Sequence, residues 1–78
     1  MESESSSSER VVAVREEPIE LSRLLKLAGA TESGGEAKQI INDGLVRVNG
    51  EVEMRKGRKL RARDRVTYGG DTFVVEVA

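Results

Sequence analysis

The chain has 78 residues, which is enough for one small domain and too few to enclose a sizeable internal pocket. It contains no cysteine and no histidine, which excludes disulfides, thiolate or imidazole metal sites and the usual nucleophile–base pairs of hydrolases. Its 13 basic and 14 acidic residues give a net charge of -1, and that balance alone predicts no nucleic-acid partner.

The first nine residues form an acidic tail that contains only Ser and Glu after Met1. Because the tail has no apolar side chains to bury, we expect residues 1–9 to be disordered and residues 10–78 to form a single domain. The tail lacks the basic start and apolar core of a signal peptide, and no apolar run approaches the ~20 residues of a membrane span. We therefore expect no membrane association and a cytoplasmic location.

A short apolar run at residues 11–14 predicts a strand. Pro18 favours the first turn of a following helix, where its missing N–H does no harm. Gly29 stands where a helix commonly ends in a left-handed cap. Between them, apolar residues at helical spacing predict one buried face, formed by Leu21, Leu24, Leu25 and Ala28.

A second helix is predicted at about residues 34–43. Ser33 and Glu36 have the spacing of a capping box, and Gly44 supplies the stop. Its apolar face consists of Ala37, Ile40 and Ile41. The link between the two helices is only a few residues long, so we expect them to pack as a hairpin.

From Leu45 the hydrophobic period changes to two, which predicts strands. Asn49-Gly50 predicts a tight turn between the first two, and Gly69-Gly70 lies inside a closing hairpin. Two helices followed by strands indicate an α+β fold. The expected core is Leu21, Leu24, Leu25, Ile40, Ile41, Val46, Val48, Val66, Phe73 and Val75.

The near-neutral total charge hides a strong asymmetry. Residues 1–20 hold six acids and two bases, whereas residues 21–78 hold eight acids and eleven bases. Residues 55–65 alone contain seven bases and one acid. This segment is either a mobile, solvated loop or a phosphate-binding surface. In the second case, alternate bases would share one face of a strand, namely Lys59, Arg61, Arg63 and Arg65.

Aromatic residues make up only 3% of the chain, and Tyr68 and Phe73 are more typical of core positions. Single-strand readers hold bases by aromatic stacking, so structured RNA, recognised through phosphate, 2′-hydroxyl and shape, fits better. The turn before the second helix could be a simple cap or could bind a phosphate at the helix N-terminus, with Lys38 reinforcing it, and the two roles are compatible. Carboxylates such as Glu53 lack a nearby apolar pocket in sequence that would shift a pKa, so we expect no catalysis. We also expect no metal, cofactor or small-molecule substrate.

Three motifs in order resemble the S4-like RNA-binding domain, and more closely the small stand-alone bacterial S4-domain proteins of the YaaA/YbcJ type. They occupy residues 20–29, 33–38 and 44–50, and the likeness extends to about Val75. The resemblance implies an αL motif, which is a helix hairpin packed on a small, curved, mostly antiparallel β-sheet of three to five short strands. It also implies RNA binding through the helix pair and the adjoining strands.

By position, the resemblance suggests a set of RNA-binding residues on both helices and the next strand: Arg23, Lys26, Ser33, Gly34, Gly35, Lys38 and Arg47. Many S4 domains have Ser-Arg where this chain has Ser33-Gly34, and Arg at the position of Lys38, so the helix start is less basic here. We expect the basic segment to compensate, and it adds Arg55, Lys56, Arg58, Lys59 and Arg61 to the candidate site.

Two functional hypotheses follow. The first is a monomeric, non-enzymatic binding module for structured RNA, with ribosomal RNA or a ribosome-assembly intermediate among the candidates. The second is a small protein-interaction module that uses an exposed sheet edge and the basic loop. Salt dependence of RNA binding and ribonuclease sensitivity of captured partners distinguish them.

Overall fold

A computed structural model describes residues 8–78. Residues 1–7, which carry most of the predicted tail, lie outside the described residues. The elements follow in the order β1 (Ser8–Val14), β2 (Ile19–Glu20), α1 (Leu21–Leu27), α2 (Gly34–Asn42), β3 (Arg47–Val48), β4 (Glu51–Val52), β5 (Lys59–Leu60), β6 (Arg65–Tyr68) and β7 (Asp71–Val77).

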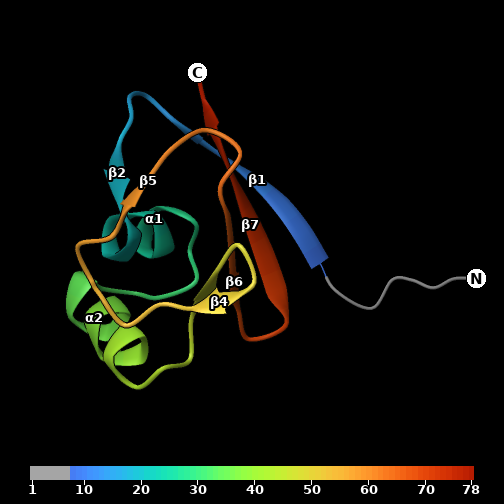
Figure 1. Ribbon diagram of the computed structural model, residues 1–78. Helices are drawn as coiled ribbons and strands as arrows, with labels where there is room; N and C mark the ends of the chain where they lie inside the picture. Colours follow the sequence, from blue (N-terminus) through green and yellow to red (C-terminus); the bar gives the residue numbers. More distant parts are fainter. Residues whose placement is uncertain (1–7) are drawn as a thin grey trace, which may run out of the picture.

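Five strands form one sheet in the order β1-β7-β6-β3-β4, and β2 pairs with β5 in a separate two-stranded sheet. All pairs in the larger sheet are antiparallel except β1 with β7, which run parallel (Figure 1). The predicted α+β architecture of a helix hairpin on a mostly antiparallel sheet is confirmed. The parallel pair was not predicted, because it joins the two ends of the domain across all the intervening elements.

Strand β1 is longer than the apolar run indicated. It begins at Ser8, so Ser8 and Glu9 belong to the sheet and not to a disordered tail as predicted. The added residues are fixed by main-chain pairing with Asp71 and Thr72 of β7, which depends little on side-chain hydrophobicity.

Helix α1 begins at Leu21, after a Glu20 cap in extended conformation, and not at Pro18 as predicted. The two residues before it pair with β5 instead, which keeps Pro18 outside the helix. The predicted stop is confirmed: Gly29 has φ 78° and donates to Lys26, while Ala30 donates to Leu25. These two hydrogen bonds form a Schellman motif, which Gly adopts without steric penalty.

Helix α2 begins where the capping box predicted. The Ser33 hydroxyl accepts a hydrogen bond from the Glu36 N–H at 3.1 Å. The Glu36 carboxylate accepts from the Glu32 N–H at 2.8 Å, one residue before the Ser33 N–H of a standard capping box. Two tight turns are also as expected: Asn49 and Gly50 both have positive φ between β3 and β4, and Gly69-Gly70 joins β6 to β7.

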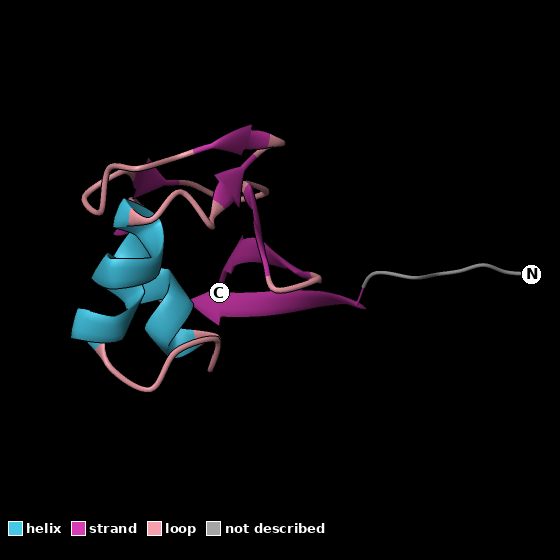
Figure 2. Ribbon diagram, turned by 90° about the horizontal axis from the view of Figure 1, so that it is seen from below, coloured by secondary structure: helices cyan, strands magenta, loops and turns pink. Residues whose placement is uncertain are grey.

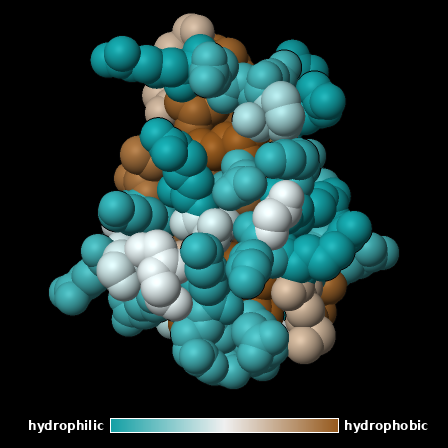
Figure 3. Space-filling view, turned by 90° about the vertical axis from the view of Figure 1, so that its left-hand side faces the viewer, coloured by the Kyte–Doolittle hydropathy of each residue, from teal (hydrophilic) through white to brown (hydrophobic). Residues whose placement is uncertain are grey.

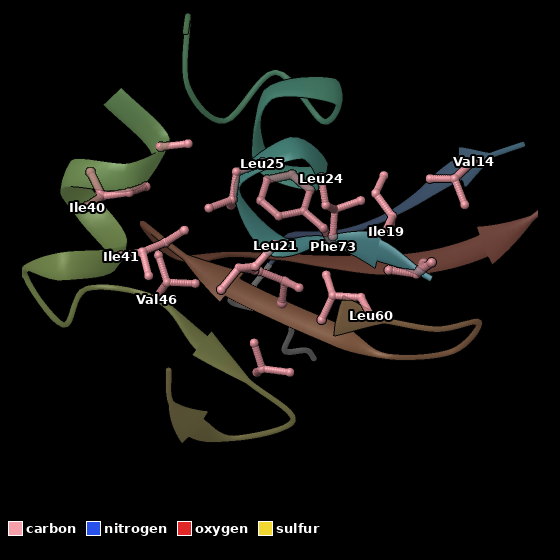
Figure 4. Close-up of a cluster of buried hydrophobic side chains, with 14 residues drawn as sticks. Val14, Ile19, Leu21, Leu24, Leu25, Ile40, Ile41, Val46, Leu60 and Phe73 are labelled. Carbon is pink, nitrogen blue, oxygen red and sulfur yellow. The ribbon is translucent and has the colours of Figure 1, made fainter. Parts of the chain in front are cut away.

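The core lies between the helix pair and the strands. Figure 2 shows the two helices next to each other with the strands beside them, and Figure 4 shows helix side chains directed toward Phe73 and Leu60. All ten residues of the expected core are buried. The core also includes four residues that the sequence reading missed: Val14, Ile19, Ala37 and Leu60.

Leu25 provides a test of this core. Its side chain is fully buried, so Leu25→Ala should destabilise the domain by about 2–5 kcal/mol through lost apolar burial and a residual cavity. Leu27→Ala is the matched control, because Leu27 lies on the same helix and is 55% exposed. Urea unfolding of both variants measures the difference, and equal midpoints would contradict the packing described.

Candidate functional site

A groove between α2 and the loop that joins β4 to β5, residues 53–58, brings together four of the predicted site residues. Gly35 and Lys38 line it from the helix, and Arg55 and Lys56 line it from the loop. The groove is open to solvent and measures about 570 Å³. Its remaining lining residues, which the sequence reading missed, are Gln39, Asn42, Met54 and Gly57.

The groove is positively charged. Three of its eight lining residues are bases, and no carboxylate is among them. Gln39 and Asn42 add side-chain amides from the exposed face of α2, one and four residues after Lys38. Plotting α2 as a helix would have found these two positions, since they share its polar face. The groove therefore combines cations with neutral hydrogen-bonding groups, as phosphate and ribose require. Figure 3 shows the side of the molecule that bears α2 and the loop as mostly hydrophilic.

A buried carboxylate fixes the basic loop. The Glu53 side chain is only 9% exposed and accepts a bidentate pair of hydrogen bonds from the Arg55 guanidinium, at 2.9 and 3.1 Å. It also accepts from the Arg55 N–H at 3.1 Å and from Nη1 of Arg58 at 2.7 Å. The Arg55 and Arg58 side chains stabilise the ionised form and lower the pKa of Glu53 from 4.5 to about 2.

The same loop closes the start of helix α1. The Leu21 N–H donates to the Arg58 carbonyl at 2.8 Å, and the Ser22 N–H donates to the Lys56 carbonyl at 3.3 Å. Glu20, at the N-cap, makes no side-chain capping bond, so these carbonyls satisfy N–H groups that a cap would otherwise serve. Main-chain bonds to α1 and side-chain bonds to Glu53 thus hold the loop. The loop is therefore held in place, and the interpretation of these residues as a mobile, solvated loop does not apply.

The four bases at positions 55–59 differ in availability. Arg55 and Arg58 share the Glu53 carboxylate, although the Arg55 side chain remains 74% exposed. Lys59 pairs with Glu20 at 3.3 Å. Within residues 8–78, Lys56 makes no ion pair, so its ammonium is the free cation on the loop side of the groove.

Arg23 and Lys59 lie elsewhere, in a second groove of about 880 Å³ between the β1–β2 connection, α1 and β5. Two carboxylates, Glu16 and Glu20, line this groove together with the bases. Its charge is therefore mixed, and it suits a phosphate less well than the first groove does.

Other predicted site residues are also separated from the first groove. Arg47 alternates with the buried Val46 and Val48, so it projects from the sheet face that turns away from the core. Lys26 is exposed in the last turn of α1. Ser33 uses its hydroxyl as the α2 cap, as the capping box predicted. Gly34 begins the helix directly after it.

The predicted basic strand does not exist. Strand β5 contains only Lys59 and Leu60, a tight turn occupies residues 61–64, and Arg65 begins β6. Lys59, Arg61, Arg63 and Arg65 therefore do not share one strand face, as the alternation suggested. Arg63 has φ 76°, a left-handed conformation that breaks the strand between them.

The described part of the chain holds no group of His, Cys, Asp and Glu that could bind a metal, and no helix long and apolar enough to cross a membrane. Phe73 is buried and Tyr68 packs partly against the core, so neither offers an open stacking platform. The surface of this part of the chain therefore offers no aromatic ring on which a nucleobase could stack, as the low aromatic content predicted.

Comparisons with known proteins agree with this architecture. The S4 domain family model matches residues 12–76. YbcJ of Escherichia coli (strain K12) is 46% identical over 57 residues, which are 73% of this chain and 81% of YbcJ. A protein of Bacillus subtilis (strain 168) named "Probable ribosome maturation protein RlbA" is 41% identical over 65 residues, which are 83% of this chain and 82% of that protein.

A solved structure is similar over nearly the whole chain. The solution structure of YbcJ from E. coli is described as revealing an alfaL motif involved in RNA-binding. It matches with a TM-score of 0.64 and 36% identity, and the match covers 97% of this chain and 95% of YbcJ. The likeness therefore includes the helix pair, the sheet and the basic loop.

Glu53 should make the domain sensitive to acid. Its pKa is lower in the folded state than the 4.5 of a free side chain, so its contribution to stability is complete above pH 4.5 and is lost as pH falls toward 2. Glu53→Gln keeps the shape but cannot titrate. Urea unfolding between pH 6 and pH 2.5 should show a steeper loss of stability in the unmodified chain than in this variant. Parallel curves would contradict the role of Glu53.

Proposed function

This chain belongs to the S4 domain family, and we propose that it is a non-enzymatic module that binds structured RNA through phosphate and shape contacts. One observation carries the proposal: the groove between α2 and the loop combines Lys38, Arg55 and Lys56 with no carboxylate in its lining. Cations from two separate elements surround one open surface, which suits the closely spaced phosphates of a folded RNA.

The geometry favours RNA over other anionic partners for two reasons. The groove is open and hydrophilic, so it accommodates a backbone that passes through and does not enclose a small ligand. The loop that presents Arg55 and Lys56 is fixed before binding, so little conformational entropy is lost when the cations meet phosphate. Recognition by shape and backbone also agrees with the lack of exposed aromatic rings.

The names of the relatives suggest a more specific partner. Because one relative is named as a ribosome maturation protein, we propose ribosomal RNA or an assembly intermediate as the RNA in question. We propose that the chain acts as a monomer, since the groove is built within one chain. An RNA of this kind would place the protein in the cytoplasm.

Salt titration tests the mechanism. Binding of a hairpin RNA should weaken steeply with salt, by about 0.7–0.9 in log K per neutralised phosphate per decade of salt. Lys38→Ala combined with Lys56→Ala should lower the affinity and reduce that slope by roughly 1.5, because about two phosphate contacts are lost. Fluorescence anisotropy at four salt concentrations measures both quantities.

Arg10→Glu is the matched control, because it lowers the net charge by the same two units at an exposed position on β1, away from the groove (Figure 1). Its affinity should stay close to that of the unmodified chain. If the salt slope of RNA binding does not change in the double lysine variant, or if the control loses as much affinity, binding through this groove is ruled out.

A protein partner is the second candidate, and one observation favours it. Strand β4 is an edge of the larger sheet, and three large apolar side chains are exposed at or beside it: Leu45 (55%), Val52 (49%) and Met54 (57%). Such an edge can accept a partner strand. Proteins that remain bound after ribonuclease digestion but are lost with Val52→Asp would support this function. Loss of all partners on digestion would favour RNA.

A further inference from the structure

We propose that the turn at residues 61–64, between β5 and β6, is a second phosphate-binding patch, so that the RNA is a stem long enough to contact both it and the groove. The inference rests on the proposed RNA-binding function and extends it to a surface away from the groove. Two arginines, Arg61 and Arg63, carry the charge of this patch, and both are exposed.

The conformation of Arg63 is the first observation. Its φ of 76° lies in the left-handed region, which Gly or Asn adopts far more readily than a long side chain does. Together with Asn49, Arg63 is one of two non-glycine residues with positive φ among residues 8–78. Asn49 belongs to a tight turn for which Asn is well suited, whereas the turn geometry gives no reason for Arg at position 63. A charged side chain in a strained backbone position points to a role for that side chain.

The turn is also rigid, because each of its four backbone N–H groups has an acceptor. The Arg61 N–H donates to Oδ2 of Asp64 at 2.8 Å, and the Ala62 N–H donates to Oε2 of Glu17 at 2.7 Å. The Arg63 N–H donates to the Val75 carbonyl at 2.7 Å, and the Asp64 N–H donates to the Arg61 carbonyl at 3.1 Å. The two guanidinium groups therefore extend from a fixed frame, as an electrostatic contact requires.

Two carboxylates lie close to these arginines, and both bond to the backbone of the turn and not to a guanidinium. Glu17 and Asp64 each direct an oxygen at a backbone N–H of the turn, and the other oxygen of Asp64 accepts from the Asn49 amide at 3.2 Å. Within residues 8–78 neither Arg61 nor Arg63 forms an ion pair. The acids thus support the turn, and the guanidinium groups remain available for an outside anion.

The position of the turn defines the class of RNA. Figure 1 places it at the top of the molecule, near the end of β7, whereas the groove lies lower, beside α2. No residue of the turn lines the groove, and the turn contacts Glu17 and the Val75 carbonyl instead, so one phosphate does not serve both surfaces. A double-stranded stem offers several phosphates in a fixed arrangement, which a short flexible strand does not.

Two RNAs and one double variant test the proposal. Arg61→Gln with Arg63→Asn removes both charges, and Asn tolerates the left-handed conformation, so the variant should melt at the same temperature as the unmodified chain or higher. Its affinity for a hairpin with a stem of about 16 base pairs should fall roughly tenfold in low salt, with a salt slope smaller by roughly 1.5. Its affinity for a hairpin whose stem is too short to span the molecule should not change.

Arg63→Lys separates charge from backbone effects, because it keeps the charge and the strain and should retain long-stem binding. Arg10→Glu again controls for net charge, since it lowers the charge by the same two units. Unchanged long-stem affinity in the double variant, while Lys38→Ala with Lys56→Ala still weakens binding, would overturn this inference and leave the proposed function standing. Equal losses on the short and long stems would also overturn it. Failure of the unmodified chain to bind either RNA would overturn both.

Discussion

The Glu53 carboxylate determines how this domain presents its positive charge. Burying a carboxylate is unfavourable unless hydrogen bonds and opposite charges compensate for lost hydration, and here Arg55 and Arg58 supply both. Their bonds to Glu53 fix the loop, and the loop in turn places the Lys56 and Arg58 carbonyls over the first N–H groups of α1. One acidic side chain therefore joins the sheet, the basic loop and the first helix.

This arrangement lowers the net positive charge of the loop and fixes its conformation. Glu53 offsets part of the positive charge of Arg55 and Arg58, so the loop attracts anions less strongly than its sequence suggests. In return the loop has one defined conformation, in which Lys56 faces the same groove as Lys38 of α2. Fixed cations lose less entropy on binding than mobile ones, so a smaller, ordered set can bind as well as a larger, flexible one.

The sequence predicted those features that depend on near neighbours. The Ser33 cap, the glycine stops at Gly29 and Gly44 and the turn at Asn49-Gly50 each follow from a few adjacent residues, and all form as expected. The groove could not be predicted in this way, because Lys38 and Lys56 come together only through tertiary packing. Glu53 looked like an ordinary surface acid for the same reason: its burial depends on where β4 ends and on the path of the loop beyond it. The alternation of bases from Lys59 to Arg65 was misleading, since Arg63 adopts a backbone conformation that propensity does not favour.

A domain of this size has little stability to lose, so the location of its functional groups matters. Lys38, Lys56, Arg61 and Arg63 are exposed, and none of their side chains contributes to the apolar core. They can change without loss of the fold, and in the proposed binding mode RNA affinity can be adjusted through them. Glu53 is different, because its hydrogen bonds order the loop whose Lys56 and Arg58 carbonyls accept from the first N–H groups of α1. A change at Glu53 alters stability and binding together, and only the exposed bases allow the two to be measured separately.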